Sequence, residues 1–100
     1  MIKHTLFFRF KPDATEAQRQ ALLAEYRDFP KTFPWMKNFS IGRNISARDS
    51  SFEYAFSIEF DSREDLDRYL LSPEHEQHVV ERFRPLVASR AIVSFVPDEL

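Results

Sequence analysis

The chain has 100 residues, of which 43% are apolar and 30% are charged, the balance of one ordinary globular domain spanning residues 1–100. Its formal net charge of -2 provides no basic field for nucleic acid, and the absence of Cys excludes disulfides and thiolate chemistry. No stretch approaches the ~20 apolar residues of a membrane span, and no apolar run of signal-peptide length opens the chain, so we expect a soluble, cytoplasmic protein with neither nucleic-acid nor membrane partners.

The first third of the chain predicts a strand followed by a helix. Residues 2–11 alternate with the period of a β-strand, and one face of it carries Ile2, His4, Leu6, Phe8 and Phe10. The sequence TEAQ at residues 15–18 has the form of a capping box with Thr15 as N-cap. Pro30 predicts that the helix begun there kinks or ends near Phe29.

The remainder predicts two strands, a broken helix and a last strand. Strands are expected at 35–45 and 52–60, with Glu53 and Glu59 on the outer face of the second, and the last strand at 90–96. A helix should begin after Ser62, and Ser72 and Pro73 have the form of an N-cap and first residue of a fresh helical segment reaching about residue 84.

This order indicates an α+β fold, the ferredoxin-like β-α-β-β-α-β pattern with an antiparallel four-stranded sheet and helices on one face. The other face would then be bare. On the first strand this face carries Thr5 and Phe7. On the last strand it carries one of two alternating sets, either Ala91, Val93 and Phe95 or Ile92, Ser94 and Val96. Exposed apolar sheet surface usually marks an interface, so we expect two copies to pack as a homodimer; the alternative is a monomer whose outer face is half polar.

Three stretches resemble one family. The sequences MIKHTLFFRFK, TEAQ and RYLLSPEHEQHV at this spacing resemble the stress-responsive A/B barrel domains, also called dimeric α+β barrels. The resemblance implies a homodimer of ferredoxin-like subunits. Functions in this family are diverse: some members are plant stress proteins that assemble into rings, and one is a polyketide cyclase that acts by intramolecular aldol condensation.

The resemblance also implies site residues. In such a cyclase a His of the Pro-x-His turn pairs with a Tyr six residues earlier, and these positions hold His75 and Tyr69; His4 matches a His on the first strand. Two positions depart from the cyclase: Phe56 stands where it has another His, and Ser72 replaces the His before Pro. The cavity of this chain should therefore be less polar.

The chemistry open to these residues is proton transfer. The N-terminus of a helix disfavours a charged imidazole at position 75, and a neutral imidazole can accept a proton, although Glu74 and Glu76 act in the opposite direction. The hydroxyl of Tyr69 can donate to an enolate or carbonyl oxygen. The alternative is that His75 and Tyr69 only satisfy hydrogen bonds at the helix break, and that His4 is a core histidine.

Apolar residues on the faces that should meet between sheet and helices are candidates for a ligand cavity or, alternatively, for a plain core: Leu6, Phe8, Leu22, Tyr26, Phe56, Ile58 and Phe83. His78 lies three residues after His75, but no third metal ligand accompanies the two. We therefore expect His78 on the solvent side of the helix, with no metal and no cofactor.

The sequence thus predicts a homodimer that binds a small apolar or aromatic carbonyl compound. Any catalysis would be cofactor-independent cyclisation, isomerisation or decarboxylation with His75 as base. One alternative is a non-catalytic stress or structural protein that acts by self-assembly. Another is a haem- or oxygen-handling enzyme of a related dimeric barrel family, for which no axial-ligand motif stands out.

Overall fold

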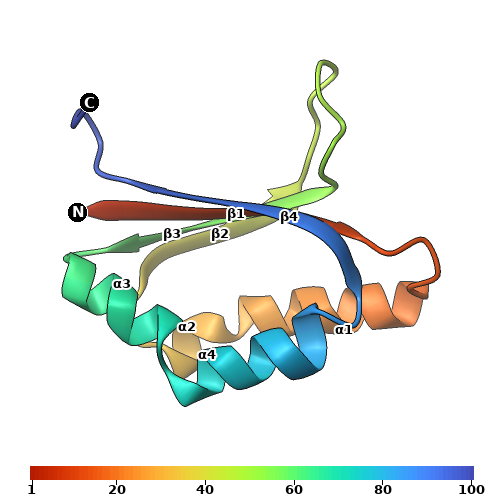
Figure 1. Ribbon diagram of the computed structural model, residues 1–100, viewed down its shortest axis with the longest axis horizontal. Coiled ribbons are helices and arrows are strands. Elements are labelled where there is room, and N and C mark those ends of the chain that lie inside the picture. Colours follow the sequence, from red (N-terminus) through yellow and green to blue (C-terminus); the bar gives the residue numbers. More distant parts are fainter.

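The computed structural model describes all 100 residues, and its centre is a four-stranded antiparallel sheet (Figure 1). The strands are β1 (Ile2–Phe10), β2 (Lys37–Arg43), β3 (Tyr54–Phe60) and β4 (Val87–Phe95), arranged in the order β2-β3-β1-β4. All three neighbouring pairs are antiparallel. The predicted ferredoxin-like α+β fold is therefore confirmed.

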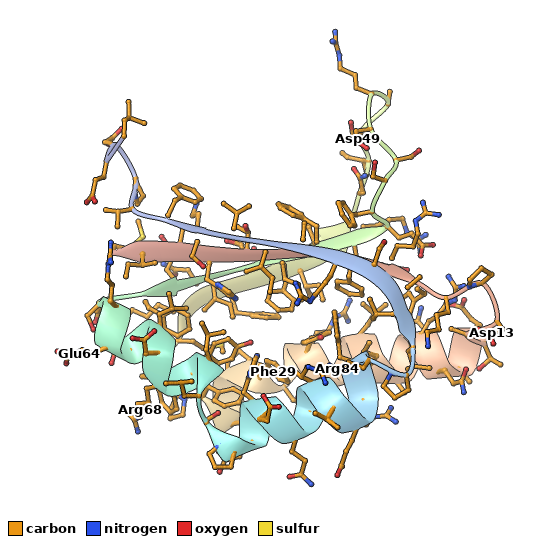
Figure 2. The ribbon with its side chains drawn as sticks, in the orientation of Figure 1. Asp13, Phe29, Asp49, Glu64, Arg68 and Arg84 are labelled. Atoms are coloured by element: carbon orange, nitrogen blue, oxygen red, sulfur yellow. The ribbon has the colours of Figure 1, made fainter.

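The helices cover one face of this sheet and leave the other bare (Figure 1). They are α1 (Glu16–Arg27), α2 (Phe29–Thr32), α3 (Arg63–Leu70) and α4 (Pro73–His78), and α4 continues into the π-helical turn η1 (Val79–Phe83). On the bare side the loop between β2 and β3 and the C-terminal tail both project away from the helices, and Asp49 lies near the tip of that loop (Figure 2). No helix is both long and apolar enough to cross a bilayer.

The helix starts and the helix break predicted from capping residues and proline are present in the structure. Thr15 forms the capping box: its side chain accepts from the amide of Gln18, whose side chain accepts from the amide of Thr15. The first helix ends at Arg27, just before the predicted break, and Pro30 lies in the first turn of the separate helix α2. Ser62 caps α3 as predicted. The segment predicted as one helix from 72 to 84 is instead α4 followed by η1, in which the amide of Arg84 bonds the carbonyl of Val79, five residues back, at 2.9 Å.

Three strands end one or two residues before the predicted ends of 11, 45 and 96, at Phe10, Arg43 and Phe95. Three strands also begin at a different residue from the prediction. The second strand begins at Lys37 rather than 35, because Met36 is held in a turn by a bond from its amide to the carbonyl of Phe33 (3.0 Å). The third begins at Tyr54 rather than 52. The last begins at Val87 rather than 90, since β4 stays paired with β1 past an irregularity at Arg9 and Phe10.

Glu53 is the residue most affected by these shifts. It lies outside the strand instead of on its outer face, and one carboxylate oxygen accepts from the amide of Phe10 at 2.8 Å. The other oxygen accepts from Arg19 at 3.4 Å. Glu53 therefore ties the loop before β3 to β1 and α1, and it contributes nothing to the polarity of the bare face.

Phe8 lies at the centre of the core between sheet and helices. Its side chain is fully buried (0% exposed). Four aromatic rings surround it with centroid distances of 5.5 to 5.9 Å, namely those of Phe10, Tyr26, Tyr54 and Phe83. These contacts join β1 to β3, α1 and η1, so the fold depends on this ring.

We predict that Phe8→Ala lowers the free energy of unfolding by about 3–5 kcal/mol, because the buried ring leaves a cavity that its neighbours can fill only in part. Urea denaturation followed by circular dichroism measures the change. The control is Ile45→Ala: Ile45 is 93% exposed in the projecting loop, and its truncation should alter stability by no more than about 0.5 kcal/mol. Equal effects of the two substitutions would contradict the central position of Phe8.

Candidate functional site

A cavity of about 170 Å³ lies between the sheet and the helices, and it is lined mainly by apolar side chains. Its polar groups are unusual: all three histidines of the chain line it, namely His4 from β1 and His75 and His78 from α4, together with Tyr69 from α3. The sequence prediction that His4, His75 and Tyr69 share one space is met by the geometry. What they bind or catalyse is a separate question.

The break between α3 and α4 brings Tyr69 and His75 together. The hydroxyl of Ser72 donates to the carbonyl of Tyr69 at 3.0 Å and accepts from the amide of His75 at 3.1 Å. Pro73 follows as the first residue of α4, where its missing N–H costs nothing. The rings of Tyr69 and His75 consequently lie 4.5 Å apart between centroids. One serine hydroxyl thus fixes the relative positions of both residues.

His4 is the deepest of the three histidines, with only 3% of its surface exposed. Its Nδ1 and the hydroxyl of Ser94, the residue opposite on β4, are hydrogen-bonded at 2.7 Å. Its ring meets Tyr69 edge-on at 6.0 Å. Burial, aided by repulsion from His75, lowers the pKa of His4 to about 4. The imidazole is therefore neutral at pH 7.

His75 is also neutral, for a similar reason. Burial lowers its pKa below the ordinary value, and the carbonyl of Leu70 opposes the shift only in part. Nδ1 of His75 is completely buried and has no hydrogen-bond partner, so Nε2 is the nitrogen that can meet a molecule in the cavity. Burial raises the pKa of the Tyr69 hydroxyl above its ordinary value, and the phenol stays protonated. The pair therefore offers a proton acceptor beside a proton donor.

His78 contradicts its prediction. It was expected on the solvent side, but it lines the cavity and its Nε2 bonds the carboxylate of Glu25 on α1 at 3.0 Å. The missed signal was the spacing itself, because residues three apart on a helix share a face; once His75 points inward, His78 must also do so. No local pattern in the sequence indicates Glu25 as the partner of His78, because the two residues are 53 positions apart.

The predicted apolar lining separates into two groups. Leu6, Tyr26, Phe56 and Phe83 line the cavity. Phe8, Leu22 and Ile58 are fully buried in the core and do not border the cavity. They lie on the correct face, but other side chains stand between them and the open space.

Two lining residues from β4 were missed because the register of that strand was unknown. Ile92 lies opposite Leu6 and Arg90 opposite Phe8, so both face the helices and border the cavity. Both are also exposed, since β4 is an edge strand. The same register places Val93 and Phe95 on the bare outer face. No three His, Cys, Asp or Glu side chains converge to hold a metal ion.

Topology and cavity together define a ferredoxin-like α+β domain with a histidine-lined cavity under a sheet that is covered on one side. The chain belongs to the stress responsive A/B barrel domain family, whose model matches residues 2–97. The resemblance drawn from the sequence is thereby confirmed.

Known proteins of this fold include enzymes. Olivetolic acid cyclase from Cannabis sativa is 28% identical over 76 residues, which cover 74% of this chain and 75% of the cyclase. The structure of hydroxynitrile lyase from Passiflora edulis superposes with a TM-score of 0.88 at 22% identity and covers 99% of this chain and 94% of the lyase.

Dimeric proteins share the fold as well. A dimeric ferredoxin-like protein of unknown function from Thermobifida fusca superposes with a TM-score of 0.80 at 22% identity, over 95% of this chain and 89% of that one. For the Thermobifida fusca protein and for the lyase, the structural likeness to this chain establishes a common fold.

We predict that folding stability falls as the pH decreases from 7.5 to 5, in part because of His4. The pKa of His4 is about 4 in the folded chain and about 6.5 when unfolded, so the unfolded state takes up the proton first. The stability that neutral His4 provides is present above pH 6.5 and is lost toward pH 4; at pH 5 the loss should reach about 2 kcal/mol.

Urea denaturation at several pH values, compared with His4→Gln, isolates this contribution. The glutamine is neutral throughout and can still bond Ser94, so its stability should decrease less over the same interval. The other two histidines titrate equally in both proteins and cancel in the comparison. Parallel pH profiles for the two proteins would show that His4 titrates normally and is not buried as described.

Proposed function

We propose that the protein is a homodimeric barrel that binds a small apolar or aromatic carbonyl compound in the cavity and catalyses proton transfer on it without a cofactor. The reaction class is cyclisation, isomerisation or decarboxylation. The observation that carries the proposal is the pair of Tyr69 and His75, with ring centroids 4.5 Å apart inside an apolar cavity.

The geometry supports separate roles for the two residues. Neutral His75 can remove a proton from the carbon next to a carbonyl group, and the electron pair then moves onto the carbonyl oxygen. The hydroxyl of Tyr69 can donate a hydrogen bond to that oxygen as its charge develops. His4, neutral and bound to Ser94, supports the Tyr69 ring from the β1 side. Olivetolic acid cyclase is by its name a cyclase, which agrees with this reaction class.

The volume limits the ligand. The cavity of about 170 Å³ is close to the ~150 Å³ of an engineered protein cavity that holds benzene. A compound with one aromatic ring and a carbonyl group is therefore the expected size. Ile92 and Arg90, at the exposed β4 edge, mark where such a molecule can enter.

We predict that acetophenone, a one-ring aromatic ketone, binds in the cavity and exchanges its methyl protons in deuterium oxide when the protein is present. His75→Ala should slow this exchange by at least about 100-fold, the usual contribution of a general base. Proton NMR measures both the exchange and the shifts of Tyr69 and His75 on binding.

Gln77→Ala is the matched control, because it changes an exposed, uncharged residue of the same helix. It should leave the exchange rate within a factor of two. Binding without exchange would remove the catalytic part of the proposal, and the absence of binding would remove the ligand class. The absence of binding would favour a protein that acts by assembly alone.

The homodimer is supported by the bare sheet face. Val93 and Phe95 on β4 are 48% and 44% exposed, and beside them Phe7 and Ala55 lie opposite each other on β1 and β3. The charged side chains of this face lie toward its ends, Lys3 and Glu59 at one end and Arg9 at the other. An exposed apolar face of this kind is costly in water and is removed when two copies pack sheet to sheet.

We predict that Val93→Glu converts the dimer to a monomer, since the carboxylate would be buried without a partner in the interface. Sedimentation equilibrium should give twice the chain mass for the wild type and the single mass for the variant. Ile45→Glu adds the same charge in the exposed loop and should stay dimeric. A wild type that is monomeric at high concentration would overturn the dimer.

A further inference from the structure

His78 is held on three sides by groups from α1, α2 and η1. Its Nε2 lies 3.0 Å from a carboxylate oxygen of Glu25. Arg82 clamps the same carboxylate with Nε and Nη2, at 2.9 to 3.2 Å. The imidazole also packs on Tyr26 and Phe29, with ring centroids 5.2 and 4.9 Å away. Only 14% of the His78 side chain is exposed, so its orientation is fixed.

The contacts also fix which nitrogen of His78 carries the proton. The hydrogen bonds from Arg82 lower the pKa of Glu25, so Glu25 is ionised and can only accept hydrogen bonds. Nε2 of His78 must therefore donate to it. In the neutral imidazole this leaves the lone pair on Nδ1.

Nδ1 of His78 remains accessible to a bound molecule. Nδ1 of His75 is the sole buried side-chain nitrogen or oxygen without a partner. Nδ1 of His78 also makes no hydrogen bond, so it is not sealed by protein, and the residue lines the cavity. His78 therefore borders the same space as Tyr69 and His75, and its Nδ1 lone pair is unoccupied.

We infer that His78, positioned by Glu25 and Arg82, is a second proton-transfer residue of the cavity. The inference rests on the proposed function and adds a group to it. Nδ1 of His78 accepts a proton from a carbon or oxygen of the ligand: the C–H or O–H bond breaks, the N–H bond forms, and the electron pair remains on the ligand. When a hydrogen returns to the ligand, a histidine N–H bond breaks and a C–H or O–H bond forms; in isomerisation and cyclisation it returns at another position.

The charges around His78 favour its holding a proton during such a reaction. The groups that face it are Glu25 and Tyr26 from α1, Arg82 from η1 and His75 from α4. Glu25 is the one carboxylate in hydrogen-bond contact and stabilises the imidazolium that forms, as a buried carboxylate does for a catalytic histidine. Burial still lowers the pKa of His78 below its ordinary value, and the resting imidazole is a base.

The first test needs no ligand. Long-range proton–nitrogen NMR of the labelled full chain reports the tautomer and pKa of each of its three histidines. His78 should carry its proton on Nε2. Glu25→Gln should lower the pKa of His78 by about 1 or more, because Arg82 remains beside the ring without its counter-charge.

Glu64→Gln removes the same charge from the outer side of α3, away from the cavity (Figure 2), and it should change neither the tautomer nor the pKa of His78. A proton on Nδ1 of His78, or equal effects of Glu25→Gln and Glu64→Gln, would overturn the positioning by Glu25.

The second test uses the exchange of acetophenone methyl protons in deuterium oxide. His78→Gln should slow the exchange by at least about 100-fold. Glu25→Gln keeps the imidazole, and it should lower the rate while shifting the midpoint of the pH–rate profile to lower pH, in step with the pKa found by NMR. A purely structural role for Glu25 would not shift that midpoint.

The outcomes separate this inference from the proposed function. If His75→Ala stops exchange and His78→Gln does not, the proposed function stands and the inference fails. If His78→Gln stops exchange and His75→Ala does not, His78 is the base and the role proposed for His75 fails. If acetophenone shifts the signals of His75 but not those of His78, then Nδ1 of His78 does not face the ligand and the inference is wrong.

Discussion

The cavity depends on one constraint, the inability of α3 to continue through Pro73. Positions six apart on an unbroken helix differ by about 240° around its axis, so Tyr69 and His75 would point to different sides. Proline lacks the amide hydrogen that a helix interior needs, and the hydroxyl of Ser72 takes up the bonds that the break leaves open. The chain therefore changes direction within two residues, and the two rings meet under the sheet. The pairing of a proton donor with a proton acceptor in the cavity follows from that meeting.

Sequence reasoning succeeded where a pattern is local and failed where a contact is not. Alternation in β1, the capping box at Thr15 and the Ser72–Pro73 break are each visible within a few residues, because the physics that sets them acts within one or two turns. The inward position of His78 was available from helical periodicity and was overlooked. Its partner Glu25 was not available, since it lies 53 residues away in sequence and only the tertiary fold brings α1 and α4 together. The lining by β4 was equally hidden, because the pairing register decides which of two alternating sets faces the helices.

The three histidines differ in how each can carry charge. Burial disfavours the protonated form of all of them, and repulsion from His75 adds to this at His4, as repulsion from His78 does at His75. Only His78 has a carboxylate in contact. Glu25 offsets part of the cost of a proton on His78, and once one histidine is protonated, like charges disfavour a second proton. A molecule entering from the β4 edge would thus meet an apolar space in which Glu25 stabilises a positive charge on His78.

The π-helical turn η1 has a further consequence. It contains one residue more than an α-helical turn. The hydrogen bond from the amide of Arg84 to the carbonyl of Val79 spans five residues instead of four and shows that extra residue. Deleting a single position would restore regular helical spacing and rotate everything beyond it by about 100°, parting Arg82 from Glu25 and Phe83 from the core together. Because Phe83 packs on Phe8 at the centre of the core, such a deletion would disturb the core as well as the cavity wall.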